Sequence, residues 1–291
     1  MNQSLKAKVA RKFRYSGWMK ALQYATGSNL QPRKWVFIVG CYNSGTTLLE
    51  DLIARHELTR ALEDEGTVLT GYLNRPEDYG WTRMWARCEA EVSLDAHTDP
   101  QLARRIKRHW SHFYRDPADR LLLEKSIVNA TRIPFFDRFF APAYFIYIRR
   151  NGYAVAEGIH RKATPGDYPQ QHVTGAYPYA LCAEQWRRSA EVIERDLAGV
   201  EHRLDLSYEE LCAAPGDTLN RIAGFLDIPP FRPEVWEGKH TVHGMESTIR
   251  NQNAGSLKRL SAADFAEINR IARPYLERYG YYQAGPTPAS P

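Results

Sequence analysis

The sequence predicts an α/β domain in which a mostly parallel sheet is covered by helices on both faces. Short apolar runs, typical of buried strands, alternate along the chain with stretches of helical periodicity. The first apolar run leads directly into a Gly-rich turn and a helix-like segment. The 291 residues, of which 43% are apolar, suffice for one large domain of this class.

Three apolar runs in the first half of the chain are predicted to be strands. Trp35–Val39 is the first, and Thr46–Arg55 is the helix that follows it after the Gly-rich turn. Arg120–Lys125 and Ala143–Arg150 are the next two strands, and a helix should begin near Gly152. Each run is short and apolar, as expected for strands that are buried on both faces of a sheet.

The second half of the chain adds one strand and two helices. The longest helix is predicted over Tyr179–Leu197, where apolar residues recur at spacings of four, three and four on one face. The stretch HRLDLSYEEL, residues 202–211, is predicted as a strand that runs into a turn. Residues 219–226 carry the apolar face of another helix, which Pro229–Pro230 should end.

The last helix has clear start and stop signals. The Ser261 side chain can cap the first turn of this helix. Asp264, three residues further on, can accept a hydrogen bond from the Ser261 N–H in return. Gly280 should end the helix, and Pro274 within it should kink it. The apolar face of this helix contains Phe265, Ile268, Ala272, Tyr275 and Tyr279.

We divide the chain into a basic helical arm (1–34), a single domain (35–283) and a flexible tail (284–291) rich in Pro and Ser. The arm has eight Lys or Arg and no acidic residue, so the remainder carries 5 − 8 = −3 of the net charge of +5. Two interpretations are open: the arm contacts acidic lipid or a polyanionic acceptor, or it is a solvated helix packed by its apolar residues. Those residues are Leu5, Val9, Phe13 and Trp18.

Composition also bears on location. The sequence has no run of about 18 uncharged apolar residues, and its N-terminus lacks the features of a secretory signal. The four cysteines have neither metal-like nor disulfide-like spacing, which is typical of free thiols in a reducing cytoplasm. They are Cys41, Cys88, Cys182 and Cys212. We therefore predict a cytoplasmic protein and expect no nucleic-acid partner.

The stretch VFIVGCYNSGTTLLEDL, residues 36–52, is typical of an anion-binding loop. Backbone N–H groups of a Gly-rich turn and of the following helical turn point at one spot and bind an anion there. Gly40 allows a tight turn, Gly45 allows close approach to the anion, and Thr46 and Thr47 add hydroxyl donors. The alternative is a tight turn without a ligand.

The loop departs from that of a nucleoside triphosphatase, whose pattern is G-x-x-x-x-G-K-[ST]. Gly40 and Gly45 have the required spacing, but Thr46 stands at the lysine position. A triphosphatase also needs a strand that ends in Asp for magnesium, whereas the strand at 143–150 ends in Arg149–Arg150. Two arginines in place of a carboxylate predict an anion site without a metal.

Five blocks follow one another along the chain. They are FIVGCYNSGTTLLEDL (37–52), LLEKSIVNATRIPFFDRFF (122–140), AYFIYIRRNGYAVAEGI (143–159), LDLSYEELCAAPGDTLNRIAGFLDI (204–228) and IRNQNAGSLKRLSAADFAEINRIARPYLERYGY (249–281). In this order they resemble the sulfotransferases that use 3′-phosphoadenosine 5′-phosphosulfate (PAPS), in particular bacterial and glycan-sulfating members. The resemblance spans about Trp35 to Tyr281. It implies the three-layer, P-loop-like sulfotransferase fold and PAPS as cosubstrate.

The resemblance also implies roles for individual residues. The loop residues that would hold the 5′-phosphosulfate are Asn43, Ser44, Gly45, Thr46 and Thr47. Lys125 would neutralise charge on the bridging oxygen as the S–O bond breaks. Arg150 would clamp the 3′-phosphate with Arg250 reinforcing it, and Tyr208 would line the adenine pocket.

Each of these roles has a plainer structural alternative. Arg149 or Arg150 forms a strand-end salt bridge, Lys125 pairs with Glu124 at the surface, and Tyr208 is a packing residue.

Two positions depart from the family pattern. Many members have Lys or Arg where this chain has Asn43, and a serine where it has Gly158. The changes remove a positive charge and a hydroxyl from the expected nucleotide site. Weaker nucleotide binding is one consequence, and a degenerate, non-catalytic binder is an open alternative.

Several residues are candidates for the general base. Members that sulfate small phenols and steroids use a histidine where this chain has Ile127, so another base is needed. Glycan-sulfating members use a glutamate beyond the loop, which points to Glu65 here, with Glu63 second. A turn of solvated carboxylates is the alternative. The histidines His56, His97, His109, His112, His160 and His172 stay as further candidates.

The resemblance implies direct, in-line and metal-independent transfer to a hydroxyl or amine of a small-molecule or carbohydrate acceptor. Aromatic residues in 71–114 and 161–179 either stack on this acceptor or form core under long loops. Two rival functions are a P-loop kinase or triphosphatase and a non-catalytic anion- or lipid-binding module.

Overall fold

Five parallel strands form the central sheet, in the order β2-β3-β1-β4-β5. The computed structural model describes residues 17–165, 173–242 and 245–285. The strands are β1 Lys34–Val39, β2 Thr59–Ala61, β3 Leu121–Glu124, β4 Ala143–Arg149 and β5 Arg203–Ser207. The predicted strands are confirmed. The edge strand β2 was missed because it has only three residues, and one of them is Arg60.

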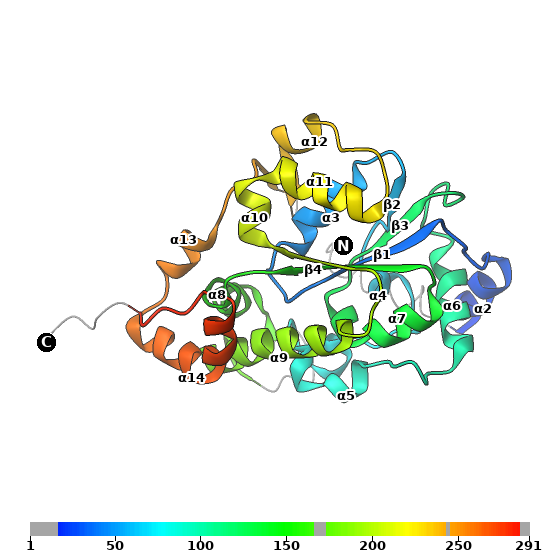
Figure 1. Cartoon of the computed structure of the whole chain (residues 1–291). Coiled ribbons are helices and arrows are strands. Elements are labelled where there is room, and N and C mark those ends of the chain that lie inside the picture. Colours follow the sequence, from blue (N-terminus) through cyan, green and yellow to red (C-terminus); the bar gives the residue numbers. More distant parts are fainter. Residues whose placement is uncertain (1–16, 166–172, 243–244, 286–291) are drawn as a thin grey trace, which may run out of the picture.

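Alternating side chains of β1 enter two separate cores. Val36 and Ile38 pack into one, whereas Trp35, Phe37 and Val39 pack into the other. Helices on the two faces complete the three layers seen in Figure 1. The first face carries α3 Thr46–Ala54, α10 Tyr208–Ala213 and α11 Pro215–Leu226, and the second carries α7 Ile133–Phe139, α8 Gly152–Lys162 and α9 Tyr179–Leu197. The predicted fold class is confirmed.

The predicted helices are present, and one predicted turn is a helix. Ser207 accepts a hydrogen bond from the Glu210 N–H (3.1 Å), and the Glu210 carboxylate accepts one from the Ser207 N–H (2.9 Å). This capping box starts α10 where a turn was expected. Ser261 and Asp264 form the predicted box at the start of α14 Ala262–Arg278, and Pro274 lies within that helix.

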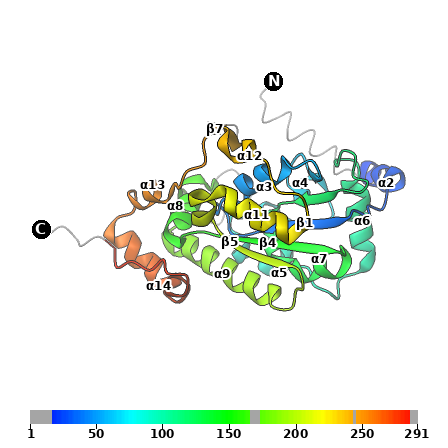
Figure 2. The ribbon, with the colours of Figure 1, turned by 45° about the horizontal axis from the view of Figure 1, so that its top comes forward.

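Shorter elements surround this frame. Figure 2 shows α2 and α6 together at one end of the molecule and α14 at the other. The remaining elements, in which η denotes a short 3₁₀ helix, are α2 Gly17–Thr26, α4 Gly66–Leu69, η1 Pro76–Tyr79, η2 Trp85–Arg87, α5 Glu89–Val92, α6 Pro100–Trp110, η3 Ile127–Thr131, α12 Glu234–Glu237, β6 His240–Val242, β7 Met245–Ser247 and α13 Asn253–Leu257. The helices in the described ranges include none that is both long and apolar enough to cross a membrane.

Several aromatic residues considered as acceptor contacts belong to the core. Trp85, Trp110 and Tyr177 are fully buried. Trp110 donates its indole N–H to the carbonyl of Gly66 (3.0 Å) and packs against Trp35. Core packing is therefore the correct interpretation for these side chains. The four cysteines form no disulfide, as predicted.

Part of the sequence interpretation lies outside the described residues. This applies to Leu5, Val9 and Phe13 of the arm, to the candidate base His172, to Tyr168, one of the aromatic residues in 161–179, and to residues 286–291 of the tail. The other arm residue singled out, Trp18, is in α2 and is 56% exposed. The division into arm, domain and tail stays a prediction.

Candidate active site

A cavity of about 840 Å³ lies where the central strands end at their carboxyl termini. Every one of the predicted site residues except Ser44 lines it. They are Asn43, Gly45, Thr46 and Thr47 after β1, Glu65 before α4, Lys125 after β3, Arg150 after β4, Tyr208 after β5, and Arg250. Segments that are far apart in sequence thus meet at one edge of the sheet, the usual position of ligand sites in open α/β sheets.

The loop between β1 and α3 turns sharply beside β4 and α10. Asn43 and Gly45 both have left-handed backbone, with φ of 61° and 92°. A Cβ atom on Gly45 would lie 2.6 Å from the Tyr208 ring, and one on Gly40 would lie 2.6 Å from the carbonyl oxygen of Ile148. Both glycines are therefore required for close packing, and Gly45 is also required for the left-handed turn.

The loop presents hydrogen-bond donors that have no protein partner. The first N–H groups of α3 have no preceding helical carbonyl to bind. The hydroxyl of Ser44 and the amide nitrogen of Asn43 are buried and make no hydrogen bond to any described residue. A buried group without a partner costs roughly 1–3 kcal/mol. Unsatisfied donors beside a helix N-terminus fit an anionic ligand in the adjoining cavity.

Arg150 is held rigidly next to this loop. Its Nη1 donates to the Asn43 carbonyl and its Nε to Oδ1 of Asn253, each at 2.7 Å. The guanidinium also stacks on the Tyr208 ring, 4.1 Å from the centroid. The hydroxyl of Tyr208 in turn donates to the Arg250 carbonyl (3.0 Å). These contacts fix a cation that is only 9% exposed at the cavity wall.

Only one of the two adjacent arginines faces the cavity. Arg149 lies on the other side of the strand end, with its guanidinium 5.3 Å from the centroid of Tyr279. The expectation that both arginines replace a carboxylate is therefore wrong for Arg149, because successive side chains of a strand point to opposite faces.

Lys125 forms a buried ion cluster. Its Nζ lies 2.9 Å from Oε1 of Glu65 and 3.7 Å from Oε2 of Glu50. Burial acts to lower the pKa of Lys125, but Glu65 and Glu50 outweigh burial and hold this pKa above its ordinary value. The lysine is therefore fully charged at neutral pH.

The alternative pairing of Lys125 with Glu124 at the surface is not found. Glu124 is buried and accepts hydrogen bonds from the Gly66 N–H (2.9 Å) and from the side chains of Ser126 and Asn129. Adjacent residues at the end of β3 thus do different things. Glu124 accepts a hydrogen bond from the first residue of α4, whereas Lys125 faces the cavity.

Sequence reasoning missed Glu50. This residue follows Thr46 by four positions in α3, so both lie on one face of the helix, and that spacing was the available signal. Burial raises the pKa of Glu50 to about 7, with Lys125 opposing the shift and Glu124 and Glu65 adding to it. Other cavity residues that were missed are Tyr42, Glu77, Thr82, Arg83, Arg161, Lys162 and Arg259.

The histidines considered as bases are not at the cavity. None of those in the described ranges lines it, and four bind backbone carbonyls instead. His56 lies 3.0 Å from the oxygen of Pro229 and His109 3.2 Å from that of Lys20. His112 lies 3.0 Å from the oxygen of Gln23 and His160 2.8 Å from that of Tyr177.

The two departures from the family pattern touch each other. A Cβ atom on Gly158 would lie 3.0 Å from Cγ of Asn43. Gly158 therefore gives the Asn43 side chain its space, and both residues line the cavity beside Arg150.

The chain is similar to known sulfotransferases in sequence and in structure. A family model described as "Sulfotransferase family" matches residues 36–233. The sulfotransferase domain from the curacin biosynthetic pathway is 21% identical, with a TM-score of 0.51 over 85% of this chain and 97% of that domain. The domain from the Synechococcus PCC 7002 olefin synthase is 20% identical, with a TM-score of 0.53 over 88% and 98% of the two chains.

A third solved structure, sulfotransferase STF9 from Mycobacterium avium, is 13% identical, with a TM-score of 0.54 over 91% of this chain and 81% of that chain. No curated protein sequence matches the chain. The structural similarities show a shared fold. The family match extends over more than half of the chain, from the loop through Lys125 and Arg150 to Tyr208. The chain therefore belongs to the sulfotransferase family.

Proposed function

We propose that the protein transfers a sulfuryl group from PAPS to a hydroxyl or amine group of an acceptor. The observation that carries this proposal is that a single cavity contains an anion-binding loop, a buried lysine and a rigid arginine. The loop matches the 5′-phosphosulfate of PAPS, and the arginine matches its 3′-phosphate. The lysine matches the site where sulfur passes from donor to acceptor.

In this proposal the donor spans the cavity. Residues 43–47, which include the unsatisfied donors of Asn43 and Ser44, bind the 5′-phosphosulfate together with the first turn of α3. Arg150 and Arg250 bind the 3′-phosphate, and Tyr208 borders the adenine. The guanidinium of Arg150 suits this task because two of its nitrogens are already held, which leaves the third to meet a phosphate oxygen.

Lys125 and Glu65 act at the reacting atoms. Glu65 takes the proton of the acceptor as the acceptor oxygen or nitrogen bonds to sulfur. The bond between sulfur and the 5′-phosphate oxygen breaks, and its electron pair stays on that oxygen, where Lys125 stabilises the charge. Glu65 and Lys125 are in contact, so base and cation can meet the acceptor and the leaving oxygen in one place.

We propose a small-molecule or carbohydrate acceptor. The cavity is also lined by Tyr42, Glu77 and Thr82, which offer hydroxyl and carboxyl groups rather than a flat apolar slot, and Tyr42 and Glu77 lie close enough to Glu65 to interact with its charge. This mixture fits a hydroxylated acceptor better than a planar phenol.

Calorimetry with 3′-phosphoadenosine 5′-phosphate (PAP) and with ATP tests the donor, and labelled-sulfate transfer over an acceptor panel tests the reaction. The proposal requires PAP to bind more tightly than ATP and label to appear on an acceptor. Magnesium-dependent binding of ATP instead would favour the kinase or triphosphatase alternative.

Exchanging Glu65 for glutamine should lower kcat by roughly 10²–10⁴-fold, because glutamine cannot take the acceptor proton. PAP affinity should stay close to that of the wild type. The measurements are steady-state sulfate transfer and PAP titration. Glu63→Gln is the matched control, because Glu63 is exposed and lines only a neighbouring cavity. Equal losses in the two variants would contradict the assignment of the base to Glu65.

A further inference from the structure

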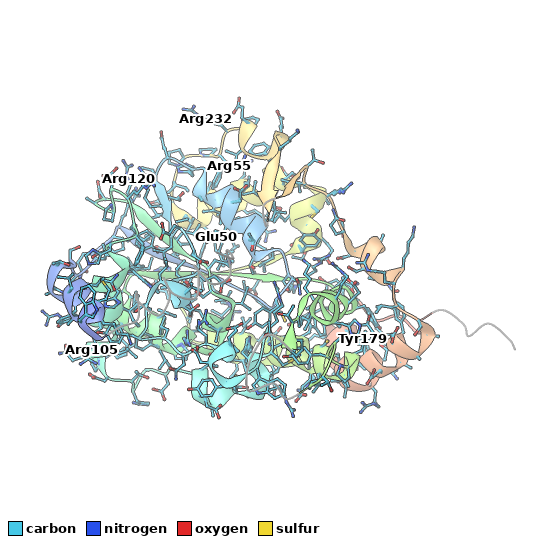
Figure 3. The ribbon with its side chains drawn as sticks, turned by 180° about the vertical axis from the view of Figure 1, so that it is seen from behind. Glu50, Arg55, Arg105, Arg120, Tyr179 and Arg232 are labelled. Atoms are coloured by element: carbon cyan, nitrogen blue, oxygen red, sulfur yellow. The ribbon has the colours of Figure 1, made fainter. Side chains whose placement is uncertain are left out.

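A second cavity meets the first at the Lys125–Glu65 pair. It has a volume of about 330 Å³ and shares Thr47, Glu65 and Lys125 with the first cavity. Glu50 lines the second cavity and not the first. Glu63 and Asp64, which also line it, are exposed, so this space leads toward solvent. Glu50, on α3, is labelled in Figure 3.

Sulfate transfer requires a second route, by which the acceptor proton can leave Glu65. Each turnover releases one proton from the acceptor, and Glu65 must lose this proton before the next cycle. While the nucleotide and acceptor fill the first cavity, that side of Glu65 is blocked. A polar space of this size holds several water molecules. Both Glu65 and Glu50 border it.

We propose that Glu50 is the relay that carries the acceptor proton away from Glu65. This inference rests on the proposed function. Glu65 takes the proton as the new bond to sulfur forms and the bond to the phosphate oxygen breaks. The proton then moves from Glu65 through water of the second cavity to the Glu50 carboxylate, and from there to bulk solvent. The nucleotide product keeps the electron pair, and no other reactant is needed.

The charges around Glu50 suit a group that gains and loses a proton. Lys125 and Glu124 face it from the end of β3, and Glu65 faces it from the segment before α4. Asp51 on its own helix is paired with Arg55 (2.8 Å). In β2, Arg60 donates to the carbonyls of Glu57 and Thr59. Burial and the two carboxylates bring the pKa of Glu50 to about 7. Glu50 can therefore both gain and lose a proton near neutral pH.

The test is the pH dependence of kcat in the Glu50→Gln variant. A relay must be deprotonated to accept a proton, so wild-type kcat should fall as the pH drops below about 7. The variant should lose roughly tenfold in kcat and lose this inflection, while PAP affinity is unchanged. Imidazole added as a small proton carrier should restore part of the rate. Glu50→Asp, which keeps a carboxylate, should keep the inflection.

Distinct outcomes separate this inference from the proposed function. If the wild type transfers no sulfate, the proposed function fails. If the wild type is active and Glu65→Gln is not, yet Glu50→Gln keeps the wild-type pH profile, only the relay is overturned. A uniform loss of kcat without imidazole rescue also overturns it, because Glu50 would then serve only to position Lys125.

A separate observation concerns the outward face of α2. Trp18 and Leu22 are 56% and 49% exposed, and only Tyr282 joins them among the exposed large apolar side chains of the described residues. They share a helix face with Ala21 and Ala25, which are also exposed. The opposite face contacts α6, where the guanidinium of Arg108 lies 4.9 Å from the centroid of the Tyr24 ring.

Basic side chains accompany this apolar face. Helix α2 carries Lys20 and no acidic residue. The adjacent α6 adds Arg104 and Arg105, both exposed, and Figure 3 shows Arg105 beside α2. We infer that the α2 face rests on an anionic lipid surface. An interfacial helix of this kind inserts Trp and Leu while neighbouring Lys and Arg meet the headgroups.

Co-sedimentation with vesicles tests this surface. Wild type should bind vesicles of phosphatidylcholine with phosphatidylserine and should bind phosphatidylcholine alone much less, with a loss of binding at high salt. The double variant Trp18→Ser, Leu22→Ser should bind at least about tenfold more weakly with unchanged sulfate transfer to a soluble acceptor. Equal binding by wild type and variant would overturn the inference. A dimer that only the variant loses, without vesicle binding, would assign the face to a second copy of the chain.

Discussion

Replacing Lys125 with alanine is expected to lower kcat for sulfate transfer by about 10²–10³-fold while PAP binding stays measurable. The lysine forms ion pairs with both Glu65 and Glu50, and it is 8% exposed. In the proposed mechanism its charge acts mainly on the bridging oxygen as the bond to sulfur breaks, so its removal should affect the transition state more than the bound nucleotide. Single-turnover transfer and PAP calorimetry measure the two effects separately.

The alanine variant also leaves two carboxylates without their cation. Removing one partner of a buried ion pair destabilises a protein by roughly 3–5 kcal/mol, so thermal melting must accompany the kinetics. Lys125→Arg is the matched variant, because it keeps the charge and should keep most of the stability. If arginine restored stability but alanine had wild-type kcat, Lys125 would be a structural residue and its catalytic role would be wrong.

The parts of the site that depend on local order could be predicted from the sequence. The loop, Lys125 and Arg150 each follow an apolar strand directly, and parallel strands bring their carboxyl ends to one edge of a sheet. The capping box at Ser261 and Asp264 was predictable for the same reason, since it needs only a spacing of three residues.

Features that depend on tertiary contacts could not be predicted in this way. Nothing in the sequence near Glu50 shows that Lys125 will lie 3.7 Å away, because the two residues are on different elements. The proximity of Asn43 and Gly158 is of the same kind. Arg149 is a different case, since the alternation of side chains along β4 already implied that only one of two adjacent arginines faces the cavity.

The second large effect is expected at Arg150. Arg150→Ala should weaken PAP binding by roughly 100-fold or more, since truncation of a buried, hydrogen-bonded charge typically costs about 2–5 kcal/mol of binding free energy. Binding of adenosine 5′-phosphate, which lacks only the 3′-phosphate, should change far less. The measurement is calorimetric titration of wild type and variant with both nucleotides, and the difference between the two losses isolates the interaction with the 3′-phosphate.

Arg149→Ala is the matched control for this experiment. The neighbouring arginine has the same charge but stacks on Tyr279 outside the cavity, so its removal should change PAP affinity by no more than about threefold. A general loss of positive potential would weaken PAP binding similarly in both variants. A local contact predicts a large loss for Arg150 alone, confined to the nucleotide with the 3′-phosphate. Equal losses of the two nucleotides in Arg150→Ala would instead mean that Arg150 mainly holds the loop through the Asn43 carbonyl.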